Sequence, residues 1–189
     1  METAKNAIKR LTKSCDTLIV IDNNKLVKVS GDLPFKEALG VANELVGVFI
    51  KDITETISTA SLINLDYMDL RTVMEKQGIA AIGAGWGTGE ERVEKAVKNA
   101  LDGQLLDIND ITKAFGVLVH VSGGEDLTLE EVYSAGKLVT RTISPESKIV
   151  WGARVNPEMQ GTAHVFICLT NVESAFLNQQ RKKRRFKLF

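Results

Sequence analysis

Residues 78–101 read GIAAIGAGWGTGEERVEKAVKNAL, and this stretch decides the fold. Its first part, Ile79–Ala84, is a short apolar run that predicts a buried strand. The segment Thr88-Gly89-Glu90-Glu91 has the Thr-x-x-Glu spacing of a capping box, which predicts the start of a helix. The apolar residues of that helix share one face, at Val93, Ala96, Val97, Ala100 and Leu101. A strand followed by an amphipathic helix indicates a sheet covered by helices.

The same pattern recurs downstream. Gly116–Val121 predicts a second strand, and Thr128-Leu129-Glu130-Glu131 is a second capping box ahead of a helix that runs to Ile143. Lys148–Ala153 and Ala163–Thr170 predict two final strands. The order β-α-β-α-β-β predicts an α+β domain over residues 70–173, with a four-stranded sheet and helices on one face.

The first 60 residues have a different pattern. Thr17–Ile21 is a continuous apolar run, typical of a strand that is covered on both faces. Leu33–Ser58 predicts a long helix with apolar residues on most sides, so we expect it to lie buried between layers as a central helix. One strand and one helix cannot cover their own apolar surface. We therefore interpret residues 1–60 as the end of a Rossmann-like α/β domain whose earlier strands are absent, and the chain as a fragment.

The charge of the chain is unevenly distributed. Its 24 Lys and Arg residues balance its 24 Asp and Glu residues, but six of the bases and none of the acids lie in the last nine residues, Arg181–Phe189. The acidic remainder argues against a nucleic-acid-binding domain, whose basic surface would lie on the fold itself. The two cysteines, Cys15 and Cys168, have no metal-ligand spacing, and no apolar run is long enough to span a bilayer. These features favour a cytoplasmic protein.

Three polar residues lie between the long helix and the second domain, in the segment 61–69. Asn64, Asp66 and Asp69 are spaced so that they can point to one place and orient a water for attack. The alternative is local capping, in which Asp69 caps the next helix and Asn64 the previous turn. Spacing alone does not decide between the two interpretations.

Two other candidate sites are weaker. The run Gly83–Gly89 follows a strand and precedes a helix, as a phosphate loop does, but it fits neither GxGxxG nor a P-loop. His120 and His164 are isolated from each other in the sequence and form no metal-ligand motif with the cysteines, so we expect them to be structural. The sequence therefore predicts no metal ligands.

Several segments resemble FtsZ, the tubulin-like cell-division GTPase, and they follow one collinear order over about residues 3–173. Their sequences are more similar to those of archaeal members than to those of bacterial ones. The strongest match is the run SLINLDYMDLRTVM at residues 61–74. The other matching segments are Asp16–Ile21 with Asn23, Ala42-Asn43-Glu44, Gly83–Arg92, Gly124–Thr128 and Ile149–Ala153. The resemblance implies that residues 1–60 end a GTPase domain whose nucleotide-binding N-terminal half, with its Gly-rich phosphate loop, is missing.

The resemblance also implies a role for each candidate residue. Asn64, Asp66 and Asp69 would enter the nucleotide pocket of the neighbouring subunit in a head-to-tail filament and position the water that attacks GTP. Asn43 would contact guanine, and Asn23 would contact the nucleoside. GTP or GDP would be bound mainly by the missing half, magnesium would accompany GTP, and this chain alone would be inactive.

The basic tail, residues 174–189, has alternative interpretations. It suits an anionic membrane surface or an acidic partner groove as well as a solvated chain end. In the FtsZ family such tails recruit membrane tethers, which implies a location at the division site. A different class of function remains open, namely a non-enzymatic regulatory or partner-binding α+β module that uses the tail as its contact.

Overall fold

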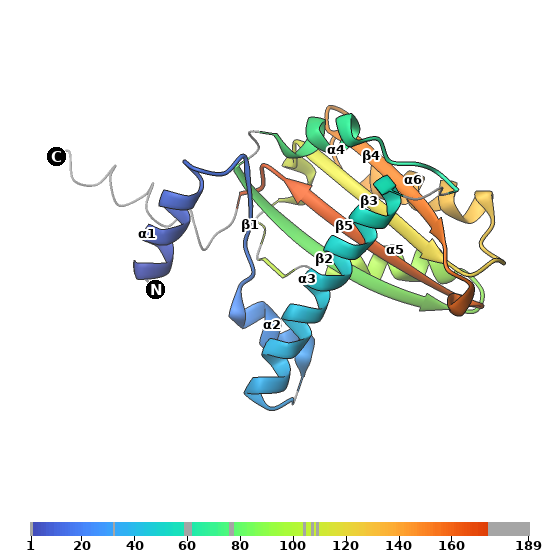
Figure 1. Ribbon diagram of the computed structural model, residues 1–189, viewed down its shortest axis with the longest axis horizontal. Helices are drawn as coiled ribbons and strands as arrows, with labels where there is room; N and C mark the ends of the chain where they lie inside the picture. The colour runs from blue at the N-terminus through green and yellow to red at the C-terminus, as the bar shows by residue number, and fades with distance from the viewer. Residues whose placement is uncertain are drawn as a thin grey trace.

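The computed structural model describes residues 2–31, 33–58, 62–75, 78–103, 105–106, 108 and 110–173. A central sheet runs through the molecule with helices packed against it (Figure 1). The first half contains α1 (Glu2–Leu11), β1 (Thr17–Ile19), α2 (Asn23–Ser30), α3 (Phe35–Ser58) and α4 (Tyr67–Met74). The second half contains β2 (Gly78–Thr88), α5 (Arg92–Asp102), η1 (Ile111–Lys113), β3 (Gly116–Gly123), α6 (Leu129–Thr142), β4 (Lys148–Val155), η2 (Pro157–Met159) and β5 (Thr162–Thr170).

The sheet has five strands in the order β1-β2-β5-β3-β4. The predicted β-α-β-α-β-β order from β2 to β5 is confirmed, but the prediction of four strands is wrong. β1 joins the sheet because it pairs in parallel with the start of β2, Thr17 opposite Gly78. The Thr17 hydroxyl also donates to the Met74 carbonyl oxygen, which ties β1 to α4. A short strand gains hydrogen bonds at the otherwise open edge of β2, which explains the extension.

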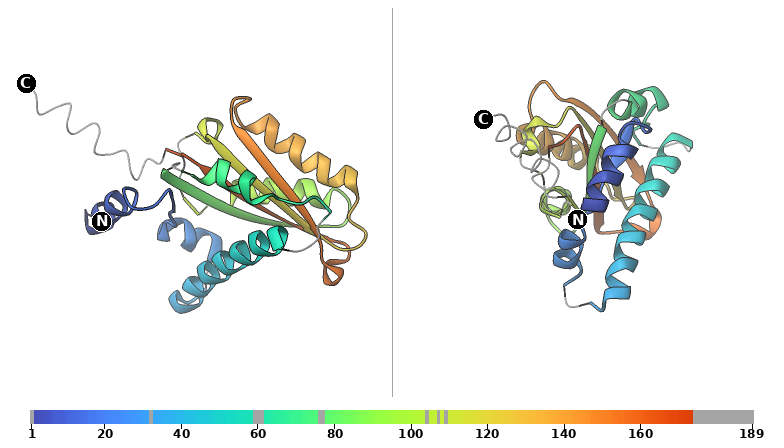
Figure 2. Two further views of the ribbon diagram at one scale, coloured as in Figure 1. Left: turned by 45° about the horizontal axis from the view of Figure 1, so that its top comes forward. Right: turned by 90° about the vertical axis from the view of Figure 1, so that its left-hand side faces the viewer.

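Helices cover both faces of the sheet (Figure 2), and the predicted α/β class is confirmed. The helices that follow β2 and β3, namely α5 and α6, lie on one face, as predicted. Helices α5 and α6 pack on one face around Val97, Val132 and Val139. Helices α3 and α4 pack on the other, where the Phe49 ring of α3 stacks on Phe166 of β5 at 4.3 Å. Two covered faces explain why every residue of β3 is buried.

Alternating glycines bring α5 close to β2. A side-chain carbon at Gly85 would lie 2.1 Å from the Ala96 carbonyl oxygen, and one at Gly87 would lie 1.8 Å from that of Arg92. The ladder with β5 continues as far as Thr88, so Thr88 belongs to β2 and does not cap α5. The predicted capping box there is wrong: the residue before α5 is Glu91, with φ 57° and no side-chain cap. The second predicted box, between Thr128 and Glu131, is confirmed.

An ion cluster joins the two helices of the second domain. The buried Arg92 guanidinium donates from Nε to Glu131 at 2.8 Å, and it also pairs with the Asp126 carboxylate. The hydrogen bond from Arg92 lowers the pKa of Glu131. Burial raises the pKa of Asp126, but bonds from Arg92 and from the Gly161 N–H outweigh it, so that pKa is also lowered. The cluster fixes the starts of α5 and α6 relative to the β4–β5 connection.

Candidate functional site

The segment between α3 and α4 is held against the edge of the sheet. The Ile63 N–H donates to the Ala153 carbonyl oxygen of β4, and the Ala153 N–H donates back to Ile63, each at 3.1 Å. Two residues later, the Leu65 side chain is 4% exposed and packs with the core under α3 and α4. The neighbouring Asn64 and Asp66 side chains are exposed. The apolar residues therefore anchor the segment and the polar ones face outward.

The start of α4 places the two carboxylates. Asp66 is the N-cap of α4, and its Oδ1 accepts the Met68 N–H at 3.0 Å. Asp69 is exposed three residues later, in the first turn. The cap and third positions of a helix lie on the same side, so Asp66 and Asp69 share one surface. The capping role considered for Asp69 belongs to Asp66, and the convergence of all three residues on one place stays a prediction.

This acidic surface lies among exposed apolar side chains. Tyr67 and Met68 are 60% and 56% exposed, and Leu62 is 47% exposed. Exposed apolar residues gathered around a few polar groups are typical of a contact surface. The carboxylate and amide oxygens can accept hydrogen bonds from a water, which is the chemical capacity that orienting a nucleophile requires.

Asn23 and Asn43 lie elsewhere. Asn23 is exposed at the first position of α2, a helix that the sequence analysis did not predict, and Asn43 is exposed on α3. The sequence signal for α2 was the cap: the Asp22 carboxylate accepts the Asn24 N–H at 2.9 Å. From Asn43 to the last residue of α3, Ser58, the helix extends roughly 22 Å. The structure therefore places both asparagines on the α2–α3 pair, away from the surface of Asn64, Asp66 and Asp69 (Figure 1).

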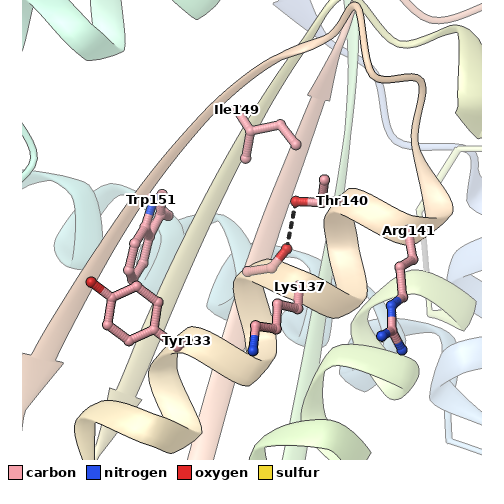
Figure 3. Close-up of a pocket in the computed structure, with 7 residues that line it drawn as sticks. Tyr133, Lys137, Thr140, Arg141, Ile149 and Trp151 are labelled. Atoms are coloured by element: carbon pink, nitrogen blue, oxygen red, sulfur yellow. Dashed lines mark hydrogen bonds between the residues drawn. The ribbon is translucent and has the colours of Figure 1, made fainter.

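A pocket lies between α6 and β4, and the sequence did not predict it. It has a volume of about 400 Å³. It is lined by Tyr133, Gly136, Lys137, Thr140, Arg141, Ile149 and Trp151 (Figure 3). Trp151 is half-buried, with its ring centroid 5.4 Å from that of Tyr133. The signal that could have found the pocket is the stripe of Tyr133, Lys137 and Arg141, four residues apart on α6.

The remaining predictions concern other parts of the chain. His120 and His164 are both buried, and the Trp86 ring lies 4.3 Å from that of His164. In the part of the chain that the structure describes, no three His, Cys, Asp or Glu side chains form a group that could hold a metal ion. No helix there is long and apolar enough to cross a membrane. The basic tail, residues 174–189, lies outside the described residues.

Known proteins resemble this chain in sequence and in fold. The model of the FtsZ family C-terminal domain matches residues 78–173. Cell division protein FtsZ 2 of Methanocaldococcus jannaschii is 42% identical over 92% of this chain and 46% of its own length. Cell division protein FtsZ 1 of Pyrococcus furiosus is 41% identical over 95% of this chain and 48% of its own length. The chain thus spans about half the length of these archaeal relatives.

Solved structures are similar as well. The empty FtsZ dimer of M. jannaschii superimposes with a TM-score of 0.82 at 39% identity, over 88% of this chain and 48% of that one. CetZ2 from Haloferax volcanii, solved as a GTPγS-bound protofilament, has a TM-score of 0.70 at 18% identity, which shows a shared fold. With the family model matched over more than half of its residues, the chain belongs to the FtsZ family.

Proposed function

We propose that this chain is part of a GTP-dependent, filament-forming cell-division protein, in which it supplies the loop that completes the GTP site of the adjacent subunit. The proposal rests on the family and on the placement of Asn64, Asp66 and Asp69. Family membership supports the general kind of protein, and the role of these three residues is what the resemblance to FtsZ implies. Their exposure at the start of α4 is compatible with that role.

The observation that carries the proposal is the anchoring of the loop. Ile63 is bonded to β4 and Leu65 is buried, so the segment cannot turn its exposed acids inward without breaking these contacts. The residues proposed to contact the nucleoside, Asn23 and Asn43, lie on α2 and α3 and not beside the loop. Acids that face away from the asparagines of their own chain are suited to the nucleotide of another subunit.

In this proposal the loop acts on the attacking water. Hydrolysis of GTP needs a water in line with the γ-phosphate, and catalysis is largely a matter of position and electrostatics. Two of the oxygens of Asp66, Asp69 and Asn64 can accept the two hydrogens of that water, which leaves its lone pair free to attack phosphorus. Magnesium accompanying GTP would supply positive charge at the phosphates, and no residue of this chain is assigned to hold it.

The nucleoside contacts are assigned to two amides. Asn43 can both donate to and accept from the edge of guanine, and Asn23 can bond the nucleoside in the same way. Both side chains are exposed, so they are available to a ligand. The rest of the GTP or GDP site belongs to sequence that this chain does not contain.

The tail and location complete the proposal. The bases of Arg181–Phe189, interleaved with Phe186 and Leu188, suit an anionic membrane or an acidic tether protein. A filament held in this way would act in the cytoplasm at the division site.

The test is a complementation assay. The chain is mixed with M. jannaschii FtsZ and GTP, and phosphate release and light scattering are followed. We expect the chain to change the rate of hydrolysis or to block filament growth, because it presents the loop to the nucleotide of a neighbour. The Asp69→Ala variant should lose any stimulation, whereas Asp102→Ala, which removes an exposed carboxylate at the end of α5, should not. Equal rates for the two variants would contradict the catalytic assignment.

A further inference from the structure

We propose that the outer edge of β4, together with the pocket between β4 and α6, binds an extended acidic segment of a partner protein by strand addition. The inference does not depend on nucleotide or on the proposed function of the loop. It rests on three observations: an open strand edge, a pocket beside it, and two cations that lack acidic partners among the described residues.

The first observation is the edge. β4 is the last strand of the sheet, and within the described part of the chain only Ile63 pairs with its outer side. Ala153 exchanges both of its backbone bonds with Ile63, so its N–H and C=O point outward. Backbone direction repeats every second residue, hence Trp151 and Ile149 also point their N–H and C=O outward. These groups form a template for one more strand.

The chain itself leaves this edge after one bridge. The Ile63 side chain packs with the core on the α5–α6 face of the sheet, whereas Leu65 packs with the core on the opposite face. The backbone therefore crosses from the edge toward α3 and α4 between these two residues. The stretch of edge from Ile149 to Trp151 has no pairing strand among the described residues.

The second observation is the pocket. Ile149 and Trp151 line it from the strand, and Tyr133 and Lys137 line it from the helix (Figure 3). The side chains of an added strand that lie opposite Ile149 and Trp151 would face the same way, over the pocket. Its volume of about 400 Å³ can hold such side chains, and the Tyr133–Trp151 pair offers an apolar wall.

The third observation is charge, and it identifies the occupant. Lys137 and Arg141 stand one turn apart, and no acid is among the residues that line the pocket. Neither cation forms an ion pair with a described residue. A segment with Asp or Glu opposite Ile149 and Trp151 would bring carboxylates to these cations. The basic tail of this chain, Arg181–Phe189, has the wrong sign for the site.

The test uses the full chain and a labelled peptide, acetyl-Val-Glu-Val-Asp-Val-Glu-Val-amide, followed by fluorescence anisotropy. We expect binding that weakens with salt, as charge pairing requires. Lys137→Glu combined with Arg141→Glu should weaken it at least about tenfold. Lys98→Glu, a single charge reversal on the exposed side of α5, should change it less than about twofold. Lys137→Glu alone, which makes the same change of charge in the pocket, is compared with it.

A second pair of probes tests strand addition. We take the added strand to run antiparallel to β4, the direction in which Ile63 already pairs with Ala153. In that direction the peptide residues opposite Ile149 and Trp151 bond through their own N–H groups, so N-methylation of the acidic residues should abolish binding. N-methylation of the valines, whose N–H groups point away from β4, should leave it within about threefold. Equal effects of the two methylation patterns would overturn the proposal.

Three further results would also overturn it: equal binding of the peptide with lysine in place of its acids, preferential binding of oligo(dT), or a chain dimer in sedimentation that excludes the peptide. The first would remove the charge argument, the second would make the site one for nucleic acid, and the third would assign the edge to a second copy.

Discussion

Ile63 and Ala153 exchange two backbone hydrogen bonds of 3.1 Å, and the residue after Ile63 is Asn64. The candidate catalytic segment is therefore built as a one-bridge extension of the sheet. Its position depends on β4 and on the buried Leu65, together with the cap that Asp66 forms on α4. The anchor at Leu65 can be tested independently of the chemistry.

Among the side chains of the segment, Leu65 should contribute most to the free energy of unfolding. Leu65→Ala should lower the free energy of unfolding by about 2–4 kcal/mol, because it leaves a cavity beside Phe49 and Val73. Leu62→Ala removes an exposed side chain and should change it by less than about 0.5 kcal/mol. Urea unfolding of the two variants measures both values. Equal losses would show that burial at Leu65 does not hold the segment.

Asp66 should have two separable roles. Asn caps helices about as well as Asp, so Asp66→Asn should keep the stability of the chain but lose its effect on GTP hydrolysis. Asp66→Ala should lose both, with about 1 kcal/mol of stability. Thermal unfolding and phosphate release in mixtures with M. jannaschii FtsZ give the two readouts. If Asp66→Asn affects GTP hydrolysis as much as the unchanged chain does, the role of Asp66 is limited to capping α4.

The chain by itself should not bind GTP tightly. It contributes Asn23 and Asn43 to the proposed site but contains no Gly-rich phosphate loop of the family type. We expect a Kd weaker than about 100 µM by calorimetry, with magnesium present. Micromolar binding would place a phosphate site within these residues, and the Asn43→Ala variant would then show whether α3 takes part.

Acid should weaken the Arg92 cluster. The pKa of Glu131 in the folded state lies below its ordinary value of 4.5, and that of Asp126 below 3.8. Both groups therefore contribute full stability above those values and lose it as the pH falls through the lowered pKa of each group. Denaturant midpoints should stay level from pH 7 to about pH 5 and fall below it.

The control is Glu131→Gln, which keeps a side chain able to bond the Thr128 N–H but has no charge to lose. Its unfolding should respond less to acid. Arg92→Met should lower the free energy of unfolding by about 3 kcal/mol near neutral pH, because it leaves the carboxylates of Asp126 and Glu131 without their cation beside a buried position. If the denaturant midpoint of Glu131→Gln falls below about pH 5 as steeply as that of the unchanged chain, the pH dependence belongs to other carboxylates.

The close approach of α5 to β2 should tolerate no side chain at Gly85. Gly85→Ala places a carbon 2.1 Å from a backbone oxygen, so α5 must shift and we expect a loss of more than about 3 kcal/mol. Gly40→Ala has open space within helix α3 and should instead stabilise the chain by about 0.5–1 kcal/mol. Urea titrations of both variants check the contrast in sign.

Periodicity predicted the second domain well, because its strands and amphipathic helices agree with their burial. The capping box at Thr128 was also predictable, since both of its bonds are local. At Thr88 the same four-residue pattern failed, because pairing with β5 competes for that residue. The union of β1 with β2 could not be predicted from residues 17–19, because it depends on an edge formed about 60 residues later.

The candidate site was predictable in part. The spacing of Asn64, Asp66 and Asp69 indicated one shared surface; the structure shows that each of the three is exposed, and their convergence stays a prediction. The anchor at Ala153 and the pocket beside Trp151 depend on contacts between distant segments, which local patterns do not record. The proposed hydrolytic role remains a prediction.

Helix α3 separates the loop from the asparagines assigned to the nucleoside, and this gives the subunit a direction. Units that contact one another through two different surfaces assemble head to tail, and such a polymer has two unlike ends. In the proposed filament one end would always present the acids beside Ile63, and the other the α2–α3 surface with Asn43. The rates of addition and loss at the two ends would then be set by different residues, so each could be altered by mutation without the other.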